Sequence, residues 1–152
     1  MRRETDTYRS CNKGFEIFNA DRSLSLSLPF ALSGIVAGFP SPASDYIEQS
    51  LDLNSLVIRN PSSTFYGRVK GNSMIDAGIA EGDIVVIDKS LQPQSNMIAV
   101  CYIDGEFTVK RIEIKKDIIY LMPANQSFKP IKVTEENNFL IWGIVTYIIK
   151  KV

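Results

Sequence analysis

The feature that most constrains the fold is a series of short apolar runs, rich in β-branched and aromatic residues, that fills the chain from residue 64 onwards. Glycine, proline, asparagine and aspartate separate these runs, as turn residues separate the strands of a sheet. The pattern predicts strands over 64–69, 83–88, 97–103, 106–114, 118–122 and 139–149. A chain of 152 residues can bury one sizeable core. We therefore expect a single, mainly β domain of twisted antiparallel strands with short helices.

Asp104-Gly105 lies between two apolar runs and is the strongest hairpin signal in the chain. A two-residue type I′ turn needs positive φ at both positions, which this pair tolerates. The turn sets a register in which Ala99 faces Lys110. One face of the sheet then surrounds this lysine with uncharged side chains: Met97, Ala99, Cys101, Ile103, Thr108 and Ile112. Burial among them would disfavour the ammonium ion and lower the pKa of Lys110.

The chain before residue 64 is organised differently. Serine and leucine alternate over 23–28, which predicts a short extended segment. The run Phe39-Pro40-Ser41-Pro42 is a stiff, non-helical hinge, because proline fixes its own φ and restricts the residue before it. We therefore expect an extended N-terminal arm over 1–37, followed by the β domain over 38–152.

Local signals also mark two short helices and one strongly apolar strand. Ser44 is a suitable N-cap for a helix over 45–49, and Asn54 for a helix over 55–59. The run 141–149 is apolar almost throughout. It fits a buried core strand as well as a strand that forms a dimer contact.

The charges of the chain balance. Lysine and arginine together number 17, as do aspartate and glutamate, so the formal net charge is zero. The long-range field that draws proteins to nucleic acid or to an anionic membrane is therefore absent, and we expect no strong direct binding to either. A link to nucleic acid would run through a protein partner.

The sequence contains no histidine, which excludes Ser-His and Cys-His mechanisms and the usual zinc sites. We expect neither a metal nor a cofactor. Cys11 and Cys101 lie far apart, which suits a reducing cytoplasm better than secretion, and we do not expect a disulfide. The stretch 24–36 comes nearest to a signal peptide, but serines and a proline dilute it and it is too short to span a bilayer.

Ser73 lies in a glycine-bounded loop, in the run Gly71-Asn72-Ser73-Met74. The glycines at 71 and 78 allow tight turns that leave a hydroxyl exposed beside free backbone amides, and such amides can hold an oxyanion. The loop is not the nucleophile elbow of the α/β-hydrolases, because position 75 is isoleucine. Taken alone, a serine in such a loop is far more often a turn residue than a nucleophile.

Several blocks, taken in order, resemble the catalytic region of the LexA and UmuD family of serine-lysine peptidases. They are Gly71-Asn72-Ser73-Met74, Gly78-Ile79, Gly82-Asp83 and the run 104–111, which reads DGEFTVKR. Upstream, the run 37–49 (AGFPSPASDYIEQ) is similar to the cleavage-site region of the UmuD branch of that family. The resemblance covers about residues 37–149.

The resemblance implies a self-cleaving peptidase of the bacterial SOS response to DNA damage. It places the nucleophile on Ser73, the base on Lys110 and the scissile bond between Ala37 and Gly38, with the backbone amides of Asn72 and Ser73 holding the oxyanion. It also implies that a RecA filament on single-stranded DNA stimulates cleavage. The shortened chain would form a homodimer that joins a UmuC-like DNA polymerase subunit in translesion synthesis, in the cytoplasm.

Three alternatives stay open. The chain could be a non-enzymatic β interaction module in which the serine-lysine pair is vestigial. It could be the peptidase part of a LexA-type or phage-type repressor, although an arm of 37 residues without a pair of amphipathic helices does not supply a helix-turn-helix domain. A membrane signal peptidase shares the serine-lysine chemistry but needs an anchoring helix.

Overall fold

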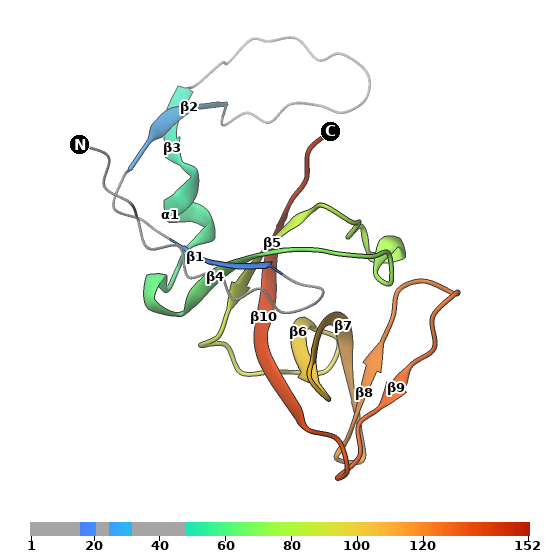
Figure 1. Ribbon diagram of the computed structural model, residues 1–152. Coiled ribbons are helices and arrows are strands. Elements are labelled where there is room, and N and C mark those ends of the chain that lie inside the picture. Colours follow the sequence, from blue (N-terminus) through green and yellow to red (C-terminus); the bar gives the residue numbers. More distant parts are fainter. Residues whose placement is uncertain (1–15, 21–24, 32–47) are drawn as a thin grey trace, which may run out of the picture.

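A computed structural model describes residues 16–20, 25–31 and 48–152 (Figure 1). Most of these residues form one eight-stranded sheet in the order β1-β4-β5-β10-β6-β7-β8-β9, in which each neighbouring pair is antiparallel. Its strands are β1 (Glu16–Asn19), β4 (Thr64–Arg68), β5 (Ile84–Asp88), β6 (Ile98–Ile103), β7 (Glu106–Lys115), β8 (Ile118–Met122), β9 (Ile131–Lys132) and β10 (Phe139–Ile149). The expectation of a mainly β, antiparallel domain is confirmed.

The remaining described elements are short. They are the strands β2 (Ser27–Ala31) and β3 (Glu48–Asp52), the helix α1 (Leu53–Val57) and the 3₁₀ turns η1 (Pro61–Ser63) and η2 (Ile75–Ala77). β2 and β3 pair with each other in a separate two-stranded sheet. In Figure 1 this sheet lies beyond α1, away from β8 and β9.

The hairpin of β6 and β7 has the register expected from its turn. Asp104 and Gly105 both have positive φ, 49° and 93°. Ala99 lies opposite Lys110 and Cys101 lies opposite Thr108. All the strands expected from residue 64 onwards are present, with bounds within one residue of the expected ones.

Alternate residues of the hairpin point into two different cores, one on each face. Val100 and Val109 join a cluster with Val69, Met74, Ile79, Val85 and Ile87. Ala99, Cys101 and Ile112 join a second cluster with Leu121 and Ile144. Because Lys110 follows Val109 and faces Ala99, it lies on the face of the second cluster.

The helices before residue 60 differ from the expected ones. Helix α1 begins at Leu53, and its N-cap is Asp52, whose carboxylate accepts a hydrogen bond from the N–H of Asn54 at 3.2 Å. Asn54 therefore lies inside the helix and is not its cap. Residues 48 and 49, expected at the end of a helix over 45–49, belong to β3 instead, because pairing with β2 outweighs a weak local preference. Ser44 and the rest of that expected helix lie outside the described residues.

The N-terminal arm supplies a strand to the main sheet, which its sequence does not indicate. β1 pairs with β4 at the edge of the sheet, and Ile17 packs against the first core cluster. The side chains of Glu16 and Arg68 form an exposed ion pair at 3.2 Å. The described parts of the arm include the strands β1 and β2, and β1 is also structural.

We predict that a fragment consisting of residues 38–152 folds but is less stable than the whole chain. Loss of β1 removes the packing of Ile17, a contribution of roughly 1 kcal/mol to the free energy of unfolding. Urea denaturation of both proteins measures the difference. In the whole chain, Ile17→Ala should reproduce most of the loss, whereas Leu28→Ala, at a residue 57% exposed on β2, should change stability by less than about 0.5 kcal/mol. Equal stability of fragment and whole chain would contradict a structural role for β1.

Candidate active site

Ser73 lies in the connection between β4 and β5. Backbone hydrogen bonds hold the two ends of this connection together. The N–H of Val69 donates to the carbonyl of Asp83 at 2.9 Å, and the N–H of Gly82 donates to the carbonyl of Val69 at 2.9 Å. Gly71 has a φ of 80°, in the left-handed region that glycine adopts without strain. The glycine-bounded loop expected from the sequence is therefore present, and its two ends are fixed.

The loop is also held between the core and the turn after β8. Met74 is only 2% exposed and packs in the first core cluster beside Ile79. On the other side, the carbonyl of Ser73 accepts a hydrogen bond from the N–H of Ala124 at 2.9 Å, and the carbonyl of Asn72 accepts one from the side-chain amide of Asn125 at 2.9 Å. The backbone at Ser73 is thus fixed from two directions, which orients its hydroxyl.

Lys110 of β7 meets this hydroxyl, although 37 residues separate it from Ser73 in the sequence. Its Nζ donates hydrogen bonds to Ser73 Oγ at 2.7 Å, to Thr108 Oγ1 at 2.7 Å and to the carbonyl of Val109 at 3.1 Å. The residue is only 6% exposed. The structure therefore brings together the two side chains that the sequence singled out as a pair.

Burial lowers the pKa of Lys110 below its ordinary value, because an apolar environment disfavours the ammonium ion. A thiolate at Cys101 would act in the opposite direction. However, burial raises the pKa of Cys101 to about 12, so its thiol is neutral at physiological pH. None of the ion pairs formed by the described residues includes Lys110. No anion in this part of the chain therefore offsets the loss of hydration at the amine.

The three hydrogen-bond partners around Lys110 Nζ can also satisfy the amine after it has lost one proton. The carbonyl of Val109 can only accept, so it retains one N–H of the neutral amine. A hydroxyl can either accept or donate. If Thr108 accepts the second N–H, the lone pair of the amine faces Ser73 Oγ, which can then donate its proton. This arrangement is that of a general base beside a nucleophile.

The sequence places Thr108 on the same face of the hairpin as Lys110 but does not predict that its hydroxyl contacts the amine. Thr108 is two residues before Lys110 on the same strand, so both side chains point to the same face. This spacing of two residues along a strand was the sequence signal that could have pointed to Thr108. A threonine at such a position is common in any strand, and its contact with an amine depends on where the lysine side chain turns.

The surroundings of Ser73 can accommodate a carbonyl and a small side chain. Within the described part of the chain, the backbone amides of Asn72 and Ser73 donate to no acceptor, as the predicted oxyanion hole requires. A pocket of about 50 Å³ adjoins Ser73, with Val69, Met74, Phe107 and Val109 as its apolar lining. Ala37 and Gly38 lie outside the described residues, in the connection between β2 and β3.

Two observations concern the described ranges, 16–20, 25–31 and 48–152. Within them, no group of three or more histidine, cysteine, aspartate or glutamate side chains is placed to hold a metal ion. No helix in these ranges is long and apolar enough to cross a membrane. Cys101 is a free, buried cysteine.

Comparison with known proteins identifies the family. The sequence pattern of the Peptidase S24-like family matches residues 29–146. Protein MucA of Salmonella typhimurium is 43% identical over 122 residues, which cover 80% of this chain and 83% of that protein. Protein SamA of Salmonella typhimurium strain LT2 is 46% identical over 115 residues, 76% of this chain and 79% of that protein. The LexA repressor of Shewanella denitrificans is 32% identical over 122 residues, 80% of this chain and 58% of the repressor. The chain therefore belongs to the peptidase S24 family, the self-cleaving serine-lysine peptidases that its sequence resembles.

Proposed function

We propose that the chain cuts its own Ala37–Gly38 bond, with Ser73 as the nucleophile and Lys110 as the general base. The observation that carries this assignment is the 2.7 Å contact between Lys110 Nζ and Ser73 Oγ at a site where burial favours the neutral amine. A vestigial pair in a non-enzymatic module would not need both a buried lysine and a serine fixed by its backbone.

The proposed reaction uses the contact between Ser73 and Lys110. Neutral Lys110 accepts the proton of Ser73 Oγ as the oxygen attacks the carbonyl carbon of Ala37, and the amides of Asn72 and Ser73 donate to the oxyanion that forms. Lys110 then gives the proton to the nitrogen of Gly38 as the carbon–nitrogen bond breaks. A water molecule, deprotonated by Lys110, then attacks the ester that joins Ala37 to Ser73, and Lys110 returns that proton to Ser73 Oγ as the ester bond breaks. The active site and the bond to be cut belong to one chain. The tether therefore gives the bond a high effective concentration at the site, which replaces binding affinity for a separate substrate.

The pocket beside Ser73 supports the choice of Ala37. A volume of about 50 Å³ accommodates a methyl group but no large side chain. Gly38 offers no side chain that would obstruct the approach of the hydroxyl. The run 37–49 places this pair of small residues directly before the hinge at Pro40.

The biological setting is the SOS response. In our proposal a RecA filament on single-stranded DNA stimulates cleavage, and the shortened chain, as a homodimer in the bacterial cytoplasm, joins a UmuC-like subunit of a translesion DNA polymerase. The similarity to MucA and SamA, at 43% and 46% identity over most of both chains, supports this role, and the LexA repressor is less similar at 32% identity.

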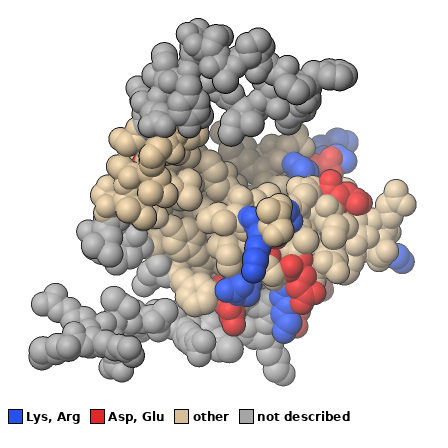
Figure 2. Space-filling view, turned by 90° about the horizontal axis from the view of Figure 1, so that it is seen from above, with Lys and Arg blue, Asp and Glu red and all other residues tan. Residues whose placement is uncertain are grey.

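Surface charge supports a role through protein partners. On the face seen in Figure 2, basic and acidic side chains lie side by side and do not form a broad basic field, which agrees with the zero net charge. Leu140, Ile148 and Ile149 of β10 are exposed apolar side chains, as a contact between two copies of the chain requires.

We predict that Ser73→Ala and Lys110→Ala each slow self-cleavage by roughly 10³-fold or more while the fold stays intact, because each removes one half of the activated nucleophile. Mass spectrometry of protein aged at alkaline pH should show fragments of 37 and 115 residues (152 − 37) from the unmodified chain. Ser127→Ala and Lys129→Ala, at exposed positions after β8, are the matched controls and should cleave normally. Cleavage by either variant of the pair would rule out the proposed mechanism.

The pocket size leads to a separate prediction about the cleaved residue. Ala37→Phe should slow cleavage by about 10²-fold, because a phenyl ring does not fit a pocket of about 50 Å³ and displaces the carbonyl from Ser73. Ala37→Gly should cleave at nearly the normal rate. Ala43→Phe, which adds the same ring six residues away, controls for effects of a bulky side chain elsewhere in the connection between β2 and β3. If Ala37→Phe cleaves as fast as the unmodified chain, the scissile bond lies elsewhere.

A further inference from the structure

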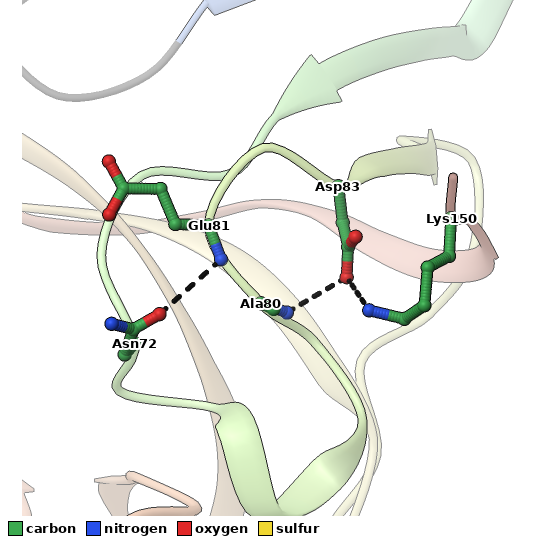
Figure 3. Close-up of polar contacts among 5 residues, drawn as sticks. All are labelled: Asn72, Ala80, Glu81, Asp83 and Lys150. Carbon is green, nitrogen blue, oxygen red and sulfur yellow. Dashed lines mark hydrogen bonds and ion pairs between the residues drawn. The ribbon is translucent and has the colours of Figure 1, made fainter. Parts of the chain in front are cut away.

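An ion pair outside the active site ties the end of β10 to the loop that carries Ser73. The Nζ of Lys150 lies 2.5 Å from Oδ2 of Asp83, the residue that precedes β5 (Figure 3). The Asp83 side chain is 8% exposed and that of Lys150 is 43% exposed. Burial is the largest influence on the pKa of Asp83 and would raise it, but the hydrogen bonds from Lys150 and from the N–H of Ala80 outweigh it and hold this pKa below its ordinary value. Asp83 is thus ionised at neutral pH.

The same carboxylate organises the loop. Its Oδ2 accepts a hydrogen bond from the N–H of Ala80 at 2.8 Å, and the next N–H, of Glu81, donates a long hydrogen bond of 3.4 Å to Oδ1 of Asn72. Figure 3 shows these contacts running across the loop, from Lys150 to the residue beside Ser73. The carbonyl of Asp83 also closes the loop by accepting from Val69. Asp83 therefore fixes both the base of the loop and the turn that faces Asn72.

The register that brings Lys150 to Asp83 depends on an irregularity in β10. Val145 lies opposite Ile87 and Tyr147 lies opposite Val86, so one extra residue, Thr146, is accommodated in β10 as a bulge. Pairing then continues to Ile149 opposite Ile84, which places Lys150 next in line with Asp83. Without the bulge, Ile149 would take that place. Bulges of this kind re-aim side chains near functional sites.

We propose that Lys150 and Asp83 act as positioning residues, a clasp that holds Ser73 in line with Lys110 for self-cleavage. This inference rests on the proposed function. Lys150 takes no part in the chemistry itself, because the hydrogen-bond partners of Lys110 Nζ are Ser73, Thr108 and Val109. Removing the clasp should therefore reduce the fraction of molecules with correct geometry and leave the titration of Lys110 unchanged.

The test measures the initial rate of self-cleavage of the full chain from about pH 6 to about pH 10, a range that brackets a lowered lysine pKa. Lys150→Met removes the charge and keeps the length of the side chain. We expect a loss of about tenfold at each pH, with the same pH midpoint as the unmodified chain. Lys151→Met, at the adjacent exposed lysine, is the matched control and should leave the rate unchanged. Lys150→Arg should restore most of the rate, because it retains the ion pair.

Asp83→Asn and the variant that combines Asp83→Asn with Lys150→Met complete a double-mutant cycle. If the two residues act as one clasp, the double variant loses no more rate than Asp83→Asn alone. All rates are taken below the unfolding transition of each variant, as followed by circular dichroism. The clasp is refuted if Lys150→Met cleaves at the normal rate, or if it shifts the pH midpoint with an unchanged plateau. If the unmodified chain shows no cleavage that depends on Ser73, the proposed function fails and the clasp fails with it.

Discussion

The site depends on one constraint. The amine of a lysine is buried on one face of an antiparallel hairpin. An ammonium ion at this position loses most of its hydration, and the neighbouring thiol of Cys101 stays neutral, so charge is disfavoured there. Hydrogen bonds to Ser73, Thr108 and Val109 satisfy the amine without an opposite charge. The same burial that makes Lys110 costly for the fold favours its neutral form, which the proposed role as general base requires.

The rest of the fold positions a serine against this amine. The β4–β5 connection is closed at Val69 and Asp83, its Met74 is buried in the core, and its backbone is fixed by the turn after β8. The segment proposed as substrate connects β2 to β3, and β3 leads into α1, whose last residue Val57 packs with Val86 of the main sheet (Figure 1). One chain thus supplies both the site and the segment proposed as its substrate, which suits a reaction that occurs once in each molecule.

The sequence predicts the fold from residue 64 onwards well, because turn residues and alternation fix both the strands and the hairpin register around Lys110. It does not predict that Ser73 reaches that lysine, since loop and strand meet only through tertiary packing; family resemblance supplied the pair. β1 and β3 are too short for a periodic signal. The ion pair of Asp83 with Lys150 depends on a bulge at Thr146 that leaves no mark in the residue pattern. Asp52 and Asn54 are both good caps, so the choice between them was made by neighbouring structure.

The most direct test of the central claim is the pH dependence of unstimulated self-cleavage. The initial rate of appearance of the 115-residue fragment is measured on the unmodified chain from about pH 6 to about pH 10. Because Lys110 in the proposed mechanism acts only when neutral and burial lowers its pKa, the rate should rise with pH, with its midpoint below the ordinary lysine pKa of about 10.4. A rate that is flat or falls across this range, while circular dichroism shows the protein folded, would contradict a lysine base.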